Sequence, residues 1–149
     1  MALTTTAISA CNVSIWLDDV SSIAHDISGS SNSCAIELTL NLGEVNAFQN
    51  QWPVRQECGK NASIDLEILY TEAANEAFDI LKDWYFANNP GARQMTIYIP
   101  DKNVGSDKFE FQARLESLSW TVEAGVADPI MVSASLRPDG EFTHTDVAT

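Results

Sequence analysis

The stretches that decide the fold are residues 34–42 (CAIELTLNL) and residues 62–70 (ASIDLEILY). Apolar side chains recur at every second position of both, at 34, 36, 38, 40 and 42 and at 62, 64, 66, 68 and 70. Successive side chains of a strand point to opposite faces, so this period predicts two strands. Each strand has one apolar face and one polar, mostly acidic face.

Residues 43–61, between these two strands, form a connection roughly four times the usual hairpin length. Pro53 argues against a central strand within it, because proline cannot donate to the hydrogen-bond ladder of a sheet. We therefore expect a long inter-strand loop over 43–61. A loop of this length indicates a function, disorder or a partner that orders it.

The composition is that of a folded globular protein with an unusual charge. The chain has 149 residues, the size of one domain, and 45% are hydrophobic. Its 21 acidic and 8 basic residues give a net charge of −13, which disfavours tight binding of nucleic acid. Three cysteines without C-x-x-C spacing indicate reduced thiols. Neither a signal peptide nor a membrane anchor is predicted, since no apolar run approaches the ~20 residues that span a bilayer.

Other segments predict further strands and a single helix. Alternation predicts strands over 12–17, 20–27, 94–100, 107–122 and 130–136, with a short strand or arm over 141–145. The apolar positions of 107–122 change phase near Glu116 and Ser117, which predicts a β-bulge or a bend. Helical spacing of Ala74, Phe78, Leu81 and Tyr85 predicts a helix over 72–87, with Thr71 as its N-cap.

The order of these elements predicts the architecture. Strands precede and follow the helix without regular alternation, so the sheet is expected to be mainly antiparallel. We predict a mainly β fold, an antiparallel β-sandwich or partial barrel with one flanking α-helix. One domain spans 1–149, with an N-terminal arm over 1–11 and a C-terminal arm over 141–149.

The sequence offers no motif for catalysis, a cofactor or a metal. The two histidines, His25 and His144, are far apart and belong to no metal-binding spacing, and no phosphate loop or nucleophile elbow is present. The carboxylate pairs Asp65/Glu67 and Glu110/Glu116 have the chemistry of a glycosidase, but acids at alternate strand positions more often form a solvated face. We expect no catalytic residue, no metal and no cofactor.

The polar strand face allows two interpretations. It is either the solvent face of a sandwich or the wall of a channel whose contents must not adhere. The residues in question come from several strands: Glu37, Thr39, Asn41, Asp65, Glu67, Glu110 and Glu116.

Several motifs resemble the major tail tube proteins of phages with long non-contractile tails. Residues 17–19 (LDD) and 25–33 (HDISGSSNS) are similar to the family's acidic turn and the loop before its first long strand. The helix that ends in Asn-Pro-Gly, the strand at 95–98 (MTIY) and the close at 133–143 (SASLRPDGEFT) are similar as well. The likeness covers roughly 12–143 and contains no catalytic fingerprint.

The resemblance implies a structural virion protein, assembled in the bacterial cytoplasm, whose six-membered rings stack into a tail tube. The polar face would line an acidic lumen that lets double-stranded DNA pass during ejection without adhering. The 43–61 loop would contact the next subunit or ring through Glu44, Phe48, Gln51, Trp52, Arg55 and Glu57, with Phe48 and Trp52 as anchors.

The same resemblance implies partners within the tail. These are other copies of the chain, the tape measure protein, the tail terminator and the baseplate or distal tail proteins. A different hypothesis is a monomeric β-sandwich that binds carbohydrate or protein, with Trp52 or Trp120 as a stacking platform.

Overall fold

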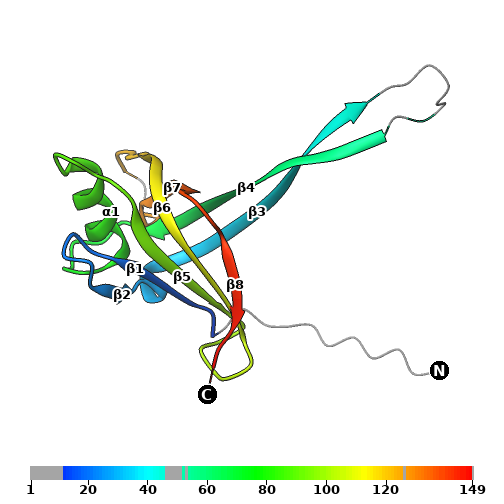
Figure 1. Cartoon of the computed structure of the whole chain (residues 1–149). Coiled ribbons are helices and arrows are strands. Elements are labelled where there is room, and N and C mark those ends of the chain that lie inside the picture. The colour runs from blue at the N-terminus through cyan, green and yellow to red at the C-terminus, as the bar shows by residue number, and fades with distance from the viewer. Residues whose placement is uncertain (1–11, 46–51, 53, 126, 149) are drawn as a thin grey trace, which may run out of the picture.

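The computed structural model describes residues 12–45, 52, 54–125 and 127–148. Eight strands, one α-helix and one 3-10 turn make up the described chain (Figure 1). In order they are β1 (Ser14–Asp18), β2 (Ala24–Asp26), η1 (Ser28–Ser30), β3 (Ser31–Val45), β4 (Val54–Leu69), α1 (Ala77–Phe86), β5 (Arg93–Ile99), β6 (Asp107–Trp120), β7 (Met131–Pro138) and β8 (Thr143–Asp146). Within the described residues, no helix has the length and hydropathy needed to cross a membrane.

All eight strands belong to one antiparallel sheet in the order β2-β1-β5-β6-β7-β4-β3, with β8 paired to β6. The sheet curls, because residues from its two ends share one core. Ile15 and Ile97, from β1 and β5, pack in the same cluster as Leu66 and Leu136, from β4 and β7. Helix α1 adds Phe78, Leu81 and Trp84 to that core. The predicted mainly β, antiparallel fold with one flanking helix is confirmed.

Strand β6 is where the sheet bends. Its register shifts between Leu115 and Ser117, so the predicted bulge is confirmed. Before the bulge, Phe111 and Ala113 are buried and the strand pairs with β5 and β8. After the bulge, Leu118 packs against the core and the strand pairs with β7 alone among the described residues. The extra residue lets both halves of one strand keep an apolar face on the core.

The predicted loop over 43–61 is wrong for most of its length. Strand β3 continues to Val45 and β4 begins at Val54, so the two strands form a hairpin of 15 and 16 residues. The outer part of this hairpin projects beyond the core as an arm (Figure 1). A register shift between Asn41 and Leu42 lies within the arm. Gly43 lies close to Cys58 there, since a Cβ at this position would lie 3.0 Å from the Cys58 sulfur unless that side chain rotated.

Helix α1 is shorter than the predicted 72–87. It begins at Ala77, and its N-cap residue is Glu76, without a side-chain cap, so the assignment of Thr71 as N-cap is wrong. The buried backbone amide of Ala77 instead donates to the hydroxyl of Ser30 at 3.1 Å. Of the four residues used to predict the helix, Phe78 and Leu81 are buried, while Ala74 and Tyr85 are exposed.

The remaining predicted strands differ from the structure at their ends, and the N-terminal arm predicted over 1–11 lies outside the described residues. The strand expected over 20–27 is reduced to Ala24–Asp26, because Asp19 closes a turn by accepting bonds from the amides of Ser21 and Ile23. The strand expected over 130–136 runs from Met131 to Pro138. The short strand predicted near the C-terminus is present as Thr143–Asp146.

Candidate assembly surfaces

The polar residues of four adjacent strands form one continuous surface, which we call the serine–acid face. Each strand contributes the residues opposite its core side. They are Glu37, Thr39 and Asn41 of β3, Ser63, Asp65 and Glu67 of β4, Ser133, Ser135 and Arg137 of β7, and Glu116, Ser117 and Ser119 of β6. The register brings them together, since Glu37 lies opposite Ser63, Asp65 opposite Ser135, and Ser135 opposite Ser117.

Small side chains make part of this face concave. A shallow depression of about 370 Å³ is lined by Asp65 and Glu67 on β4 and by four serines on the two neighbouring strands: Ser117, Ser119, Ser133 and Ser135. The acids therefore lie beside short hydroxyl side chains that occupy little space above the sheet.

Arg114 lies opposite Arg137 at one end of this face and pairs with Asp139, with an Nε to Oδ2 distance of 2.8 Å. Arg137 is the one basic residue of the set named above. Its Nε donates to a carboxylate oxygen of Glu116 at 2.7 Å. This hydrogen bond lowers the pKa of Glu116 and raises that of Arg137, and the charges of Asp65 and Glu37 raise the latter further. Four carboxylates against one guanidinium leave the face with a net negative charge.

The predicted lumen residue Glu110 lies apart from the others. It belongs to the first half of β6, where it is opposite Thr96 of β5 and Thr143 of β8. Its carboxylate pairs with the ammonium of Lys108 at 2.5 Å. The structure thus groups six of the seven predicted lumen residues on the serine–acid face and leaves Glu110 on the part of the sheet built by β5 and β8.

The other face of the arm carries a row of leucines on β3, which lie opposite Ala62, Lys60 and Glu57 of β4. Leu38, Leu40 and Leu42 are 63%, 48% and 53% exposed, although all three alternate with polar residues as core positions do. We call these three residues the leucine face. The outer part of the arm has no helix or second layer of the described chain beside it (Figure 1).

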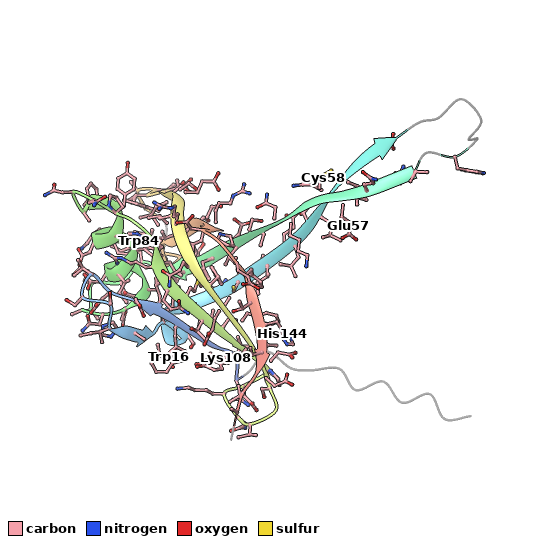
Figure 2. All side chains as sticks on the ribbon, viewed as in Figure 1. Trp16, Glu57, Cys58, Trp84, Lys108 and His144 are labelled. Atoms are coloured by element: carbon pink, nitrogen blue, oxygen red, sulfur yellow. The ribbon has the colours of Figure 1, made fainter. Side chains whose placement is uncertain are left out.

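The predicted contact residues that the structure describes lie along the arm. Glu44 and Arg55 face each other across it, with an Arg55 Nη2 to Glu44 Oε1 distance of 3.0 Å. Glu57 is opposite Leu42, and Figure 2 shows it on the arm next to Cys58. Trp52, near the tip, is 81% exposed. Phe48 and Gln51 lie outside the described residues.

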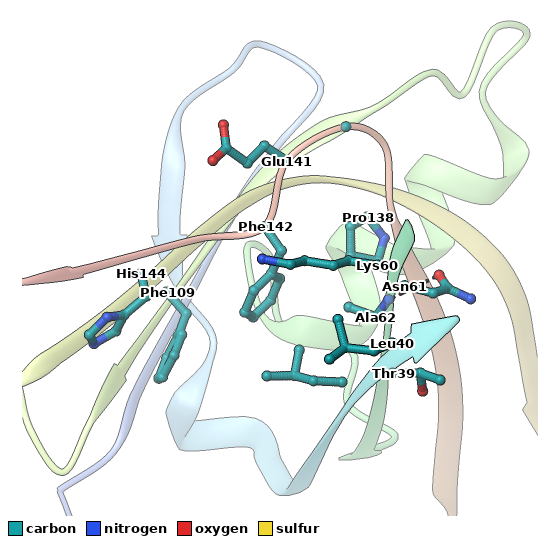
Figure 3. A pocket seen from close by; sticks show the side chains of 12 residues that line it. Thr39, Leu40, Lys60, Asn61, Ala62, Phe109, Pro138, Glu141, Phe142 and His144 are labelled. Carbon is teal, nitrogen blue, oxygen red and sulfur yellow. Dashed lines mark hydrogen bonds between the residues drawn. The ribbon is translucent and has the colours of Figure 1, made fainter. Parts of the chain in front are cut away.

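A groove lies between the base of the arm and the C-terminal strand (Figure 3). Its volume is about 650 Å³, and its apolar walls are formed by Leu38, Leu40 and Ala62 on one side and Phe109 and Phe142 on the other. The ring centroids of Phe109 and Phe142 are 5.8 Å apart. The leucine face is thus continuous with this groove.

The four-stranded part of the sheet, β6-β7-β4-β3, has two edges without a partner strand among the described residues. Strand β3 pairs only with β4, and its outer edge is open along the whole strand. The second half of β6 pairs only with β7, because β5 ends opposite Ala113. Unpaired edges present rows of amide and carbonyl groups that readily pair with another strand.

The geometry gives little support to the hypothesis of an enzyme or to that of a carbohydrate-binding protein. Glu116 is bound by Arg137, and its lowered pKa is the opposite of what a general acid requires. Trp120 packs edge-on against Phe78 at 5.6 Å between ring centroids, and Tyr70 lies on the same cluster. The ring is therefore partly used in packing.

Each histidine is paired with an aspartate. His25 Nε2 lies 2.8 Å from Asp19 Oδ2, and His144 Nε2 lies 2.8 Å from Asp107 Oδ1. Asp146 joins the second pair, a grouping that the sequence analysis missed. Nothing in the linear sequence reveals it, because Asp107 and His144 are brought together only by the pairing of β6 with β8.

No protein-family model and no curated protein matches the sequence. Solved structures do match, at low identity and over nearly the whole chain. The SPP1 tail tube is 11% identical with a TM-score of 0.75, covering 96% of this chain and 81% of that one. A chain in the tail of the empty gene transfer agent particle, solved with C6 symmetry, is 15% identical with a TM-score of 0.71, covering 93% and 99%.

A third match comes from an extracellular contractile injection system. A chain of its PVC sheath–tube complex in the extended state is 15% identical with a TM-score of 0.69, covering 95% of this chain and 93% of that one. Each alignment spans more than nine-tenths of this chain. The chain has the fold of the phage tail tube proteins.

Proposed function

We propose that this chain is a tail tube subunit, a structural virion protein that self-assembles into rings of six which stack into a hollow tube. The observation that carries the proposal is the combination of this fold with a four-stranded wall, β6-β7-β4-β3, that ends in two open edges. The ring size follows the C6 symmetry of the gene transfer agent tail, whose chain has the same fold.

Strand directions support closure of the wall into a barrel. Three successive antiparallel pairings leave β3 and β6 running in opposite directions. In a cyclic ring, β3 of one subunit would then meet the second half of β6 of its neighbour as an antiparallel pair. The same contact repeated around the ring closes the sheet and removes every open edge of the wall.

The two faces of the arm fit the two sides of such a barrel. The serine–acid face would line the lumen, with Glu37, Asp65 and Glu67 facing the DNA. The leucine face would lie on the outside of the wall, where neighbouring subunits or the next ring cover it. Glu44, Arg55, Glu57 and Trp52 of the arm would complete that contact. Burial of the leucines explains why an apolar stripe is kept on a projecting hairpin.

The charge of the proposed lumen suits DNA transport. Phosphates of double-stranded DNA would be repelled by the acids, so the genome slides during ejection without binding. Glu110 is placed outside this set, on the β5 and β8 part of the sheet. The tail tube role also implies a tape measure protein, a tail terminator and baseplate or distal tail proteins as partners, and the virion as the location.

The proposal is tested by following the purified chain over a range of concentrations by analytical ultracentrifugation and negative-stain electron microscopy. We expect rings or hollow tubes above a threshold concentration. A chain that stays monomeric at high concentration, and that is absent from the tails of particles carrying its gene, would contradict a tube role.

A further inference from the structure

The C-terminal strand β8 is attached to β6 in a way that places two acids directly opposite each other. Asp107 at the start of β6 pairs in register with Asp146 at the end of β8. Like charges at directly opposed positions destabilise a strand pair. Asp146 takes part in no ion pair within the part of the chain that the structure describes. A cation between Asp107 and Asp146 would offset this repulsion.

A histidine lies on the same face of the same strand pair. His144 is two residues before Asp146, so the two side chains point to one side of β8, and Asp107 and Phe109 share that side of β6. The His144 ring lies against the Phe109 ring, with 5.2 Å between centroids, which limits its orientation (Figure 3). One ligand atom from each of Asp107, His144 and Asp146 lies within 4.8 Å of the others.

We propose that Asp107, His144 and Asp146 bind a divalent transition-metal ion of the Zn²⁺ type, which fastens β8 to β6. One imidazole nitrogen and two carboxylate oxygens are a ligand set that such ions favour, and three protein ligands leave a position for water. This departs from the expectation from sequence that no metal is bound. The inference does not depend on the tail tube proposal.

The observed geometry needs only a small adjustment to hold the ion. With metal–nitrogen and metal–oxygen bonds of about 2.0 Å and tetrahedral angles, two ligand atoms lie about 3.3 Å apart. His144 Nε2 and Asp107 Oδ1 are now 2.8 Å apart, and both side chains are about half exposed, so rotation about their side-chain bonds can open the gap. The ion would replace the hydrogen bond between these two atoms, with a neutral imidazole as its ligand and the remaining ring N–H on the other nitrogen.

Such an ion would stabilise the position of more than the four residues of β8. The backbone just after this strand holds the loop before β6, through Gly105 N to Val147 O at 3.1 Å and Val147 N to Ser106 O at 2.9 Å. A metal ion bound between β6 and β8 would make it harder for β8 and the loop before β6 to separate from the sheet. Amide hydrogen exchange in β8 reports that separation directly.

The other histidine of the chain provides a matched control. His25 has the same 2.8 Å contact with an aspartate, Asp19. Among the described residues, however, the group of Asp107, His144 and Asp146 is the one in which three ligand atoms converge. The His25 and Asp19 side chains are 23% and 21% exposed, against 53% and 51% for His144 and Asp107, so both pairs are open to solvent to a different degree. An effect of metal on a histidine–aspartate pair alone should therefore appear at both histidines.

The test titrates the full chain with Zn²⁺ in a large excess of Mg²⁺, which occupies non-specific acidic sites, and follows both imidazoles by NMR. We expect the His144 signal to shift saturably with one equivalent and the His25 signal to stay in place. Asp146→Asn should weaken binding at least tenfold and His144→Gln should abolish it, while His25→Gln should leave it unchanged. Zn²⁺ bound only by cysteine thiols would move neither imidazole.

Hydrogen exchange gives a second readout. Zn²⁺ should slow exchange of the β8 amides in the wild-type chain and in His25→Gln, but not in His144→Gln. Equal shifts of both imidazoles, no shift of His144, or binding that survives His144→Gln would each overturn the proposal.

Discussion

The leucine face of the arm should control assembly without controlling folding. We consider the triple change Leu38→Thr, Leu40→Thr and Leu42→Thr, which introduces polar, β-branched side chains suited to a strand. In the isolated chain these leucines are largely exposed, so their replacement removes little core packing. In the proposed tube they are covered by other copies. The variant should therefore fold normally and assemble poorly.

The size of the effect follows from the exposed fractions. Complete burial of a leucine contributes about 2 kcal/mol. Exposures of 63%, 48% and 53% leave about half of that for each side chain to gain on assembly, or about 3 kcal/mol for the three together. At about 1.4 kcal/mol per tenfold change, the concentration needed for assembly should rise up to about 100-fold.

The measurement is the threshold concentration for tube formation, from sedimentation and electron microscopy of the wild-type chain and the variant. Val104→Thr is the matched control, because Val104 is 61% exposed but lies in the loop before β6, away from the arm. It should leave the threshold unchanged. Thermal unfolding of the unassembled proteins should differ little. A triple variant that assembles at the wild-type concentration would refute the burial of the leucine face.

Three further predictions concern charge and reactivity. Replacing Glu37, Asp65 and Glu67 with lysine should permit assembly but slow DNA ejection. Added salt should restore the ejection rate, because contacts between lysines and DNA phosphates release counterions and so weaken as the salt concentration rises. Ejection kinetics equal to wild type at low salt would count against a lumenal position of these residues. The hydrogen bond from Arg137 is the main cause of the lowered pKa of Glu116. The pair therefore stabilises the fold at pH values above the unfolded pKa of 4.5, and this contribution is lost as the pH falls through the folded pKa. Glu116→Gln should make stability fall less steeply with pH on the acid side, and an unchanged slope would exclude the effect. Burial, followed by the charge of Asp65, raises the pKa of the Cys34 thiol to about 11. Alkylation of the native protein at pH 8, followed by peptide mapping, should therefore label the exposed Cys58 well before Cys34. Equal labelling of the two cysteines would show that Cys34 is accessible.

The central strands and the bulge could be predicted because burial imposes a period on the sequence. Residues 34–42 and 62–70 alternate where one face lies on or beside the core, and the phase change near Glu116 marks the bend of β6. The serine–acid face followed from the same alternation, since the residues between core positions must point away from the core. Glu110 has the same parity but lies before the bulge, beside different strands.

The arm was missed because its outer residues carry no such signal. Positions 54–60 are exposed on both faces, so polar and apolar residues do not alternate there, and Pro53 added a misleading cue. The start of helix α1 was missed for another reason. Its first buried amide is capped by Ser30, 47 residues earlier in the chain, and such a tertiary contact cannot be read from local sequence. The grouping of His144 with Asp107 and Asp146 depends on strand pairing in the same way.

The most direct test of the tail tube account is a cryo-EM reconstruction of the assembled protein at a resolution that shows strand pairing and side chains. The account predicts a six-fold ring in which β3 of one subunit pairs antiparallel with the Leu115–Trp120 half of β6 in the next, with Glu37, Asp65 and Glu67 facing an open lumen. A tube whose lumen is lined by the leucine face, or an assembly in which β3 and β6 remain unpaired, would contradict it.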